Sequence, residues 1–392
     1  VIAKRIDRAE AIDRLRIIEN MHEQDQLELQ RDVFKYSSKR LSPFERLRSD
    51  WVAGQLVRAG LIHERAVPSD IREASQITML KFGQRCLEEK DARHRDLGAE
   101  QIADAMYREF RDWAEGTARQ PASAFPLAAE DVLRKALLLG YDEAQAGEPL
   151  TFLYRLQATP DFKTIRLLQK SEVPDLQPVA ENNGFPQADM CDYGEEKAVG
   201  TKGIVLSLTR QAIINNDLST AALTASGAGA AARRAEADDI HAMLTSSYLM
   251  KDGTELFHAS RNNLAGAAAA PSVSTVDAIR LAMAGFTGPS DATLNMYPSV
   301  LICGRGYEGT SATLRNAQYL PMQEAITPGY TPGSFVVVSD GRFGNEWFML
   351  ADPRYHSGIV KLHLEGSAGQ PQIEFMTQFE YDGVQGRVRH DY

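Results

Sequence analysis

Residues 215–232 read NNDLSTAALTASGAGAAA, and they predict a long helix. Asn215, Asn216 or Asp217 can cap its start, and it is expected to run towards Ser246. Residues 221–232 are almost entirely Ala, Gly, Ser and Thr. Because each glycine costs a helix about 1 kcal/mol, we expect a second element to approach this helix closely. The alternative is a low-complexity run with no packing role.

The charged residues divide the chain near residue 120. Residues 1–120 hold 22 Lys and Arg against 22 Asp and Glu, so this part is neutral. The other 272 residues hold 21 and 31, which accounts for the whole net charge of −10. Proteins that grip nucleic acid neutralise phosphates with basic residues, so this composition disfavours sequence-specific DNA binding. The small residues and proline of 117–125 mark the boundary.

The neutral part is predicted to be helical. Apolar residues recur every three or four positions from Ile2 to Met21, and Ser42-Pro43-Phe44-Glu45 is a capping-box pattern. Another helix is expected to start at Ser69 or Asp70. A last one places four apolar residues on one face and stops near Gly116: Ile102, Met106, Phe110 and Trp113. Such helices form either an assembly arm that lies over a neighbouring subunit or an ordinary helical domain.

The acidic part is predicted to be rich in strands and turns, after a short helix at 129–139 that Gly140 ends. The expected strands are 150–156, 161–169, 203–209, 334–338, 346–350, 358–364, 372–381 and 384–390. Residues 171–200 form a long excursion, from which strand 203–209 returns beside strand 161–169. A two-stranded arm of this kind buries little of its own surface, so it is expected to rest on another chain.

One motif suggests a dinucleotide site. Residues 304–309 read GRGYEG, a literal G-x-G-x-x-G between a predicted strand and a predicted helix. Asp340 follows Gly309 by 31 residues, where about 20 are expected before a ribose-binding carboxylate. No run of βαβ units accompanies the motif. A structural strand-turn-helix is therefore favoured over a nicotinamide site.

Other patterns of catalytic or metal-binding chemistry are missing from the sequence. Cys86, Cys191 and Cys303 are widely spaced, so neither a disulfide framework nor a zinc site is predicted. Acidic neighbours make Cys191 a poor nucleophile. No cofactor, metal or catalytic residue is predicted.

The histidines follow the same trend. Asp238 and Asp239 beside His241 point apart on a helix. A metal shared by His356 and His363 is disfavoured, because the two are seven residues apart and a strand begins between them.

Targeting signals are also missing from the sequence. No stretch approaches 18 consecutive apolar residues, and the first residues are densely charged, so we expect an unsecreted chain that does not span a membrane. Val1 in place of Met is consistent with a cut that removes an upstream segment during maturation.

Several short motifs, in order along residues 123–392, resemble a known family. They are Asp161-Phe162-Lys163, residues 209–218 (TRQAIINNDL), Leu256-Phe257-His258 with Asn263-Leu264, residues 347–353 (WFMLADP) and residues 382–392. Together they resemble tailed-phage major capsid proteins of the Mu-like head-subunit type, including those fused to a prohead protease. Residues 1–120 lie outside the resemblance.

The resemblance implies an α+β fold of the Hong Kong 97-like capsid type, with an extra helical N-terminal region. Its implied parts are a helical N-terminal arm at 1–122, the start of the P-domain at 123–159, an E-loop hairpin at 160–203, the P-domain with its spine helix at 204–274, an A-domain at 275–355 and the returning P-domain strands at 356–392. The motif at 304–309 then falls in the A-domain.

The implied function is structural and not enzymatic. Subunits would form hexamers and pentamers of an icosahedral head around double-stranded DNA, in the virion and assembled in the bacterial cytoplasm. Scaffold, prohead protease, portal and decoration proteins are implied as partners. The residues expected to act in assembly are Trp51, Trp113, Lys170, Lys197, Lys202, Arg210 and Asp217. An encapsulin-like shell and a nicotinamide-dependent enzyme are the alternatives.

Overall fold

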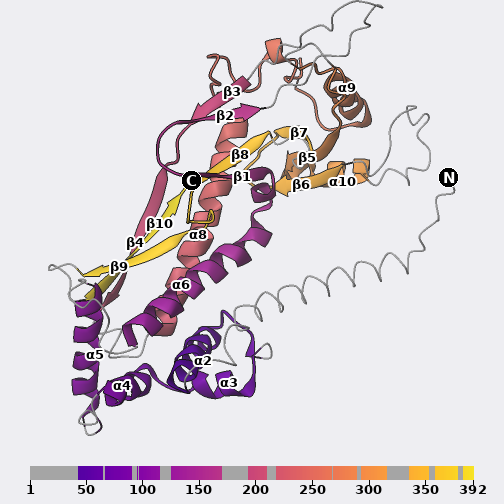
Figure 1. Cartoon of the computed structure of the whole chain (residues 1–392). Helices are drawn as coiled ribbons and strands as arrows, with labels where there is room; N and C mark the ends of the chain where they lie inside the picture. Colours follow the sequence, from indigo (N-terminus) through magenta and orange to yellow (C-terminus); the bar gives the residue numbers. More distant parts are fainter. Residues whose placement is uncertain are drawn as a thin grey trace, which may run out of the picture. The chain divides into compact units, whose positions relative to one another are not determined.

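The computed structural model describes residues 43–64, 67–90, 95, 97–114, 125–169, 193–209, 218–266, 268–288, 293–315, 335–352, 358–377 and 383–392. The chain divides into two compact units. The first holds the described residues up to Tyr141 with 203–230 and 372–389, and the second holds 142–202, 231–371 and 390–392. Helices and strands are mixed in both, which confirms the predicted α+β class (Figure 1).

The first unit begins with a run of helices: α2 (Pro43–Arg58), α3 (Ser69–Ser75), α4 (Met79–Lys90), α5 (Ala99–Ala114) and α6 (Phe125–Glu143). The predicted starts of α2, at Pro43, and of α3, at Ser69, are confirmed. Gly60 follows the end of α2 with a φ of 76°, a conformation that favours glycine. The predicted helix at 2–21 lies outside the described residues.

These helices share a single hydrophobic core. The indole of Trp51 stacks on Phe82 with ring centroids 4.0 Å apart, and its N–H donates to the Ile77 carbonyl at 3.1 Å. The same buried cluster extends through Met106 of α5 to Leu137 of α6. Helices α2, α4 and α5 are therefore packed into one core with α6.

The long predicted helix is α8 (Leu218–Thr245), and it packs closely on α6 (Figure 1). A Cβ at Gly229 would overlap the Leu137 carbonyl oxygen, and a Cβ at Gly140 would overlap that of Ser226. The predicted close approach is therefore confirmed at Gly229, whereas a Cβ at Gly227 would meet no atom within 4 Å. The predicted stop at Gly140 is wrong, because α6 continues through this residue to Glu143 and uses it as the contact with α8.

A three-stranded sheet completes the first unit, with β4 (Thr201–Thr209), β10 (Gly383–Asp391) and β9 (Gln372–Thr377) in that order. Strands β9 and β10 pair antiparallel, and Thr377 lies opposite Val384. The prediction that strand 203–209 returns beside strand 161–169 is wrong, since β4 pairs with β10. Leu206 of β4 packs against the core of the first unit, which holds the strand in this sheet.

The second unit contains three small sheets. β1 (Tyr154–Thr159) pairs parallel with β8 (Ile359–Leu364), and β2 (Ile165–Gln169) pairs antiparallel with β3 (Tyr193–Lys197). In the third, β5 (Pro298–Gly304) lies between β6 (Val336–Asp340), which is parallel to it, and β7 (Trp347–Ala351), which is antiparallel. Helices α9 (Val273–Ala284) and α10 (Glu308–Arg315) belong to the same unit.

Two predicted strands, 150–156 and 161–169, begin four residues later than expected. Pro149–Phe152 is a 3-10 turn, with Leu150 buried in it and Leu153 buried directly after it, and strand β1 starts only at Tyr154. Asp161 forms a turn in which its side chain accepts from the Lys163 amide at 3.1 Å, so strand β2 starts at Ile165.

The core of the second unit forms where α8 packs on the sheet of β6, β5 and β7. Ala237 and Ile240 of α8 lie in one buried cluster with Ile302 of β5 and Phe343. Among the helices that the structure describes, none combines the length and the apolarity needed to cross a membrane.

Candidate functional site

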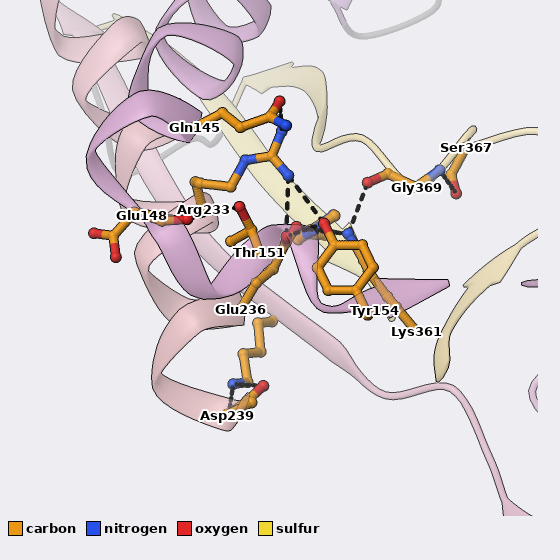
Figure 2. Close-up of polar contacts among 12 residues, drawn as sticks. Gln145, Glu148, Thr151, Tyr154, Arg233, Glu236, Asp239, Lys361, Ser367 and Gly369 are labelled. Carbon is orange, nitrogen blue, oxygen red and sulfur yellow. Dashed lines mark hydrogen bonds and ion pairs between the residues drawn. The ribbon is translucent and has the colours of Figure 1, made fainter. Parts of the chain in front are cut away.

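Charged side chains gather in the interior of the second unit around the carboxylate of Glu236 (Figure 2). Arg233 and Glu236 lie one turn apart on α8, Lys361 is in β8 and His390 is near the end of β10. Each of these four side chains is no more than 7% exposed. Together with Tyr154 at the start of β1, they form the Glu236 cluster.

Glu236 accepts four hydrogen bonds from four different residues. Its Oε1 accepts from Lys361 Nζ and from His390 Nε2, both at 2.6 Å. Its Oε2 accepts from the Tyr154 hydroxyl at 2.8 Å and from Arg233 at 3.2 Å. These donors come from α8, β1, β8 and β10, so one carboxylate ties four elements together.

The second contacts of the donors extend the network (Figure 2). Lys361 Nζ also donates to the Gly369 carbonyl at 3.0 Å, and Arg233 donates to the Tyr154 hydroxyl at 3.0 Å and to Gln145 at 3.4 Å. Lys361 Nζ lies 3.4 Å from His390 Nε2. Two cations therefore surround one carboxylate, and any charge on His390 would add a third.

Burial shifts the protonation of the whole cluster. It lowers the pKa of His390, and the charges of Lys361 and Arg233 lower it further, against the hydrogen bond to Glu236. Burial likewise lowers the pKa of Lys361, opposed by Glu236. Burial and the Glu236 carboxylate raise the pKa of Tyr154. His390 is therefore neutral at neutral pH.

The arrangement is suited to holding elements together. Every oxygen of Glu236 already accepts two hydrogen bonds, and the carboxylate is almost wholly buried. A general acid or base must instead reach a substrate within hydrogen-bond distance. We therefore interpret the Glu236 cluster as a structural joint.

A second ion cluster surrounds Arg342, which follows β6. Its guanidinium contacts Glu148 at 2.7 Å, Asp238 at 2.6 Å and Asp340 at 3.0 Å. These three carboxylates raise the pKa of Arg342 despite its burial. Asp239, next to Asp238, binds Lys202 instead, so the two neighbouring carboxylates point apart as predicted.

The G-x-G-x-x-G segment is a strand, a turn and a helix, as the structural interpretation predicts: β5, Arg305–Tyr307 and α10. A Cβ at Gly304 would overlap the Gly344 carbonyl, so backbone already occupies that space. The Asp340 carboxylate is 4% exposed and is bound by Arg342. The space beside Gly304 is thus filled by backbone, and the Asp340 carboxylate is already bound by an arginine of the same chain. Neither is available for a nucleotide.

Two of the lysines predicted to act in assembly, Lys197 and Lys202, lie in described strands of the chain. Lys202 of β4 donates twice to Asp239, at 2.6 and 2.7 Å, and lies 5.2 Å from the centre of the Tyr392 ring. Lys197 of β3 lies 4.5 Å from the centre of the Tyr248 ring. Lys170, Arg210 and Asp217 lie outside the described residues.

The two tryptophans were also predicted to act in assembly. Trp51 is fully buried in the core of its own chain. The backbone of Trp113 belongs to α5, and its side chain lies outside what the structure describes. Like the lysines, these residues keep their roles in assembly as predictions.

The Glu236 cluster is not among the sites that the sequence predicts. One signal was available, because Lys361 interrupts the apolar run Ile359-Val360-Lys361-Leu362. A lysine inside a buried strand needs a partner. The run does not indicate which residue that partner is, however, because Glu236 is 125 residues away. In the part of the chain that the structure describes, no group of three or more His, Cys, Asp or Glu could hold a metal ion.

A family model described as phage capsid protein matches residues 194–392, just over half of the chain. The chain belongs to the phage capsid protein family. This confirms the predicted resemblance and gives the chain a structural role as a shell-forming capsid protein. The match covers α8, β4 and all of the described strands after them.

Comparison with solved structures finds further similarities to this capsid chain. The holo-SrpI encapsulin complex from Synechococcus elongatus PCC 7942 is 11% identical, with a TM-score of 0.40 over 62% of this chain and 81% of that chain. A virus-like particle from Pyrococcus furiosus is 14% identical, with a TM-score of 0.35 over 66% and 91%. The procapsid of satellite phage P4, with its size determination protein, is 9% identical, with a TM-score of 0.32 over 66% and 85%. No curated protein matches the chain.

One of the resembling motifs of this capsid chain has a clear structural reason. The Asn263 side chain accepts from the His258 amide at 2.9 Å and donates to the Leu256 carbonyl at 2.7 Å. Phe257, between them, packs against Phe348 of β7 with ring centroids 5.3 Å apart. The asparagine closes the turn that places this phenylalanine against the core of the second unit.

Proposed function

We propose that this chain is the major subunit of an icosahedral phage head. Copies of it form hexamers and pentamers, which enclose double-stranded DNA. The family match over residues 194–392 carries the proposal. Assembly takes place in the bacterial cytoplasm, with scaffold, protease, portal and decoration proteins as partners.

Exposed apolar side chains support contacts with neighbouring copies. Ile204 and Val205 are adjacent on the edge strand β4 and are 53% and 55% exposed, so they present apolar surface on both faces of the strand. Leu281 of α9 is 78% exposed. The hairpin of β2 and β3 is a sheet of only two strands, which is marginally stable without support from elsewhere.

The charge of the chain supports a shell that encloses DNA without gripping it. The net charge of −10 belongs to residues after 120. An acidic wall repels the phosphates of the genome, so DNA can move during packaging and release. The proposal therefore includes no sequence-specific DNA contact.

Electron microscopy and light scattering of the purified chain test this proposal. We expect closed particles or capsomers in negative stain. Val205→Lys places a charge on the exposed apolar part of β4 and should reduce assembly, whereas Ser207→Lys, on the same exposed strand, is the matched control. A clean monomer of the unsubstituted chain at high concentration would contradict the proposal. Particles that hold a protein cargo and no nucleic acid would point instead to an encapsulin-like shell.

A further inference from the structure

The last three residues of the chain hold the segment that joins β3 to β4. Gly200 and Tyr392 exchange backbone hydrogen bonds of 2.9 and 3.0 Å. The Thr201 hydroxyl donates to the Asp391 carboxylate at 2.7 Å. Residues 199–202 comprise the end of the short connection after β3 and the first two residues of β4, so these bonds secure the base of the β2–β3 hairpin.

The same three residues are attached to the Glu236 cluster through His390. Its Nε2 donates to Glu236 Oε1 at 2.6 Å, and its side chain is 4% exposed. The His390 ring also packs against the Tyr392 ring with centroids 4.6 Å apart. A change at His390 therefore affects both its hydrogen bond to Glu236 and its packing against Tyr392.

We propose that residues 390–392 are an acid-sensitive latch, in which protonation of His390 releases them from residues 199–202 and frees the base of the β2–β3 hairpin. The latch is a property of the single chain, so it does not depend on the proposed assembly into a shell.

The charges around His390 explain why a proton would open the latch. Helix α8 contributes Arg233 and Glu236, β8 contributes Lys361 and β1 contributes the Tyr154 hydroxyl. Farther out, Asp239 forms an ion pair with Lys202, and Asp238 forms one with Arg342. With neutral His390 the cluster carries two cations and one anion. Protonation makes three cations around that anion in a buried site, which is costly unless the histidine moves into water.

The direction of the pH dependence follows from linkage. Burial lowers the pKa of His390 in the latched state, so the released state binds the proton more tightly. Latching is therefore fully favourable above the ordinary histidine pKa of about 6.5 and weakens as the pH falls below it. One linked proton raises the release constant by up to about tenfold per pH unit.

Amide hydrogen exchange of the full chain at pH 7.5 and pH 5.5 tests the latch. The readout is the protection of the Gly200 and Tyr392 amides, corrected for the intrinsic pH dependence of exchange. We expect the opening constant of these amides to rise on acidification, by up to about tenfold for one pH unit below 6.5. His390→Gln keeps a hydrogen-bond donor towards Glu236 but cannot be protonated, so its opening constant should not change with pH. His363→Gln, on the neighbouring part of β8, should behave like the unsubstituted chain.

An opening constant of the unsubstituted chain that does not change with pH would overturn the proposal, and so would an unchanged pH dependence in His390→Gln. If His390→Gln does not fold, NMR of the unsubstituted chain with carbon-13-labelled histidine replaces it. Titration of His390 together with the loss of Gly200 protection supports the latch. Titration of His390 at an ordinary pKa, with no coupled loss of protection, refutes it.

Discussion

Glu236 is the residue on which the buried charges of the second unit depend. Its carboxylate lies 2.6 Å from Lys361 Nζ and 3.2 Å from the Arg233 guanidinium. Both cations are almost wholly buried. Loss of the carboxylate would remove a close negative charge from two buried cations, which is more costly than loss of an exposed pair.

Glu236→Gln is therefore expected to lower the free energy of unfolding by about 3–5 kcal/mol. Urea denaturation at pH 7.5, followed by circular dichroism, measures this change. Arg387→Gln is the matched control, because it breaks an exposed ion pair with Glu374 of 2.6 Å and should cost less than about 1 kcal/mol. Equal costs for the two substitutions would show that the Glu236 cluster is not a joint.

Cys86 gives a second expectation for a single residue. Burial, together with the nearby Glu109 carboxylate, raises the pKa of the Cys86 thiol to about 12. The thiolate is the reactive form, so a native chain carrying Cys191→Ser should resist alkylation at pH 8 and react only after denaturation. Mass spectrometry after iodoacetamide treatment measures the labelling. Rapid labelling of Cys86 in the native state would contradict its place in the core.

Helices α6 and α8 meet through glycines rather than through interlocking side chains. Gly140 on α6 and Gly229 on α8 are each approached by the backbone of the other helix. Gly227 lies two residues earlier on α8, and a Cβ added there would have no atom within 4 Å. Gly229 is therefore needed for the contact between the helices, whereas Gly227 has room for a side chain.

Gly229→Ala is expected to destabilise the chain by about 1–3 kcal/mol, because the added methyl group would force the helices apart. Gly227→Ala should stabilise it by up to about 1 kcal/mol, since alanine favours a helix and meets no neighbour. Thermal unfolding of both variants measures the difference, and each serves as the control for the other. A stabilising Gly229→Ala would mean that α6 and α8 do not pack as described.

The first unit is held together by one core that spans distant parts of the sequence. Trp51 and Phe82 lie in the same buried cluster as Leu137, Ala222 and Val388. The helices before residue 115 are therefore more than an attachment to the acidic part of the chain. Their removal would uncover apolar side chains of α6 and of the strands.

Deletion of residues 1–115 is thus expected to lower the melting temperature and to increase the binding of a hydrophobic dye such as ANS. Differential scanning fluorimetry and dye titration measure both effects. Leu56→Ala in the full chain should cause a smaller loss, of about 2–5 kcal/mol, because it removes one fully buried side chain from the same core. A deletion variant that melts like the full chain and binds no dye would show that the helices form an independent arm.

The sequence by itself determined the helix starts at Pro43 and Ser69, the long small-residue helix, the strand-rich C-terminal part and the family. These features depend on caps, periodicity and short motifs, which act over a few residues. Only the tertiary structure decided that Gly140 is a contact and not a stop, and that β4 pairs with β10. It also decided the Glu236 cluster, whose partners lie 82, 125 and 154 residues away from Glu236. A local sequence pattern can indicate that a buried charge needs a partner. Which distant residue is that partner depends on the fold, because only folding brings the two within hydrogen-bond distance.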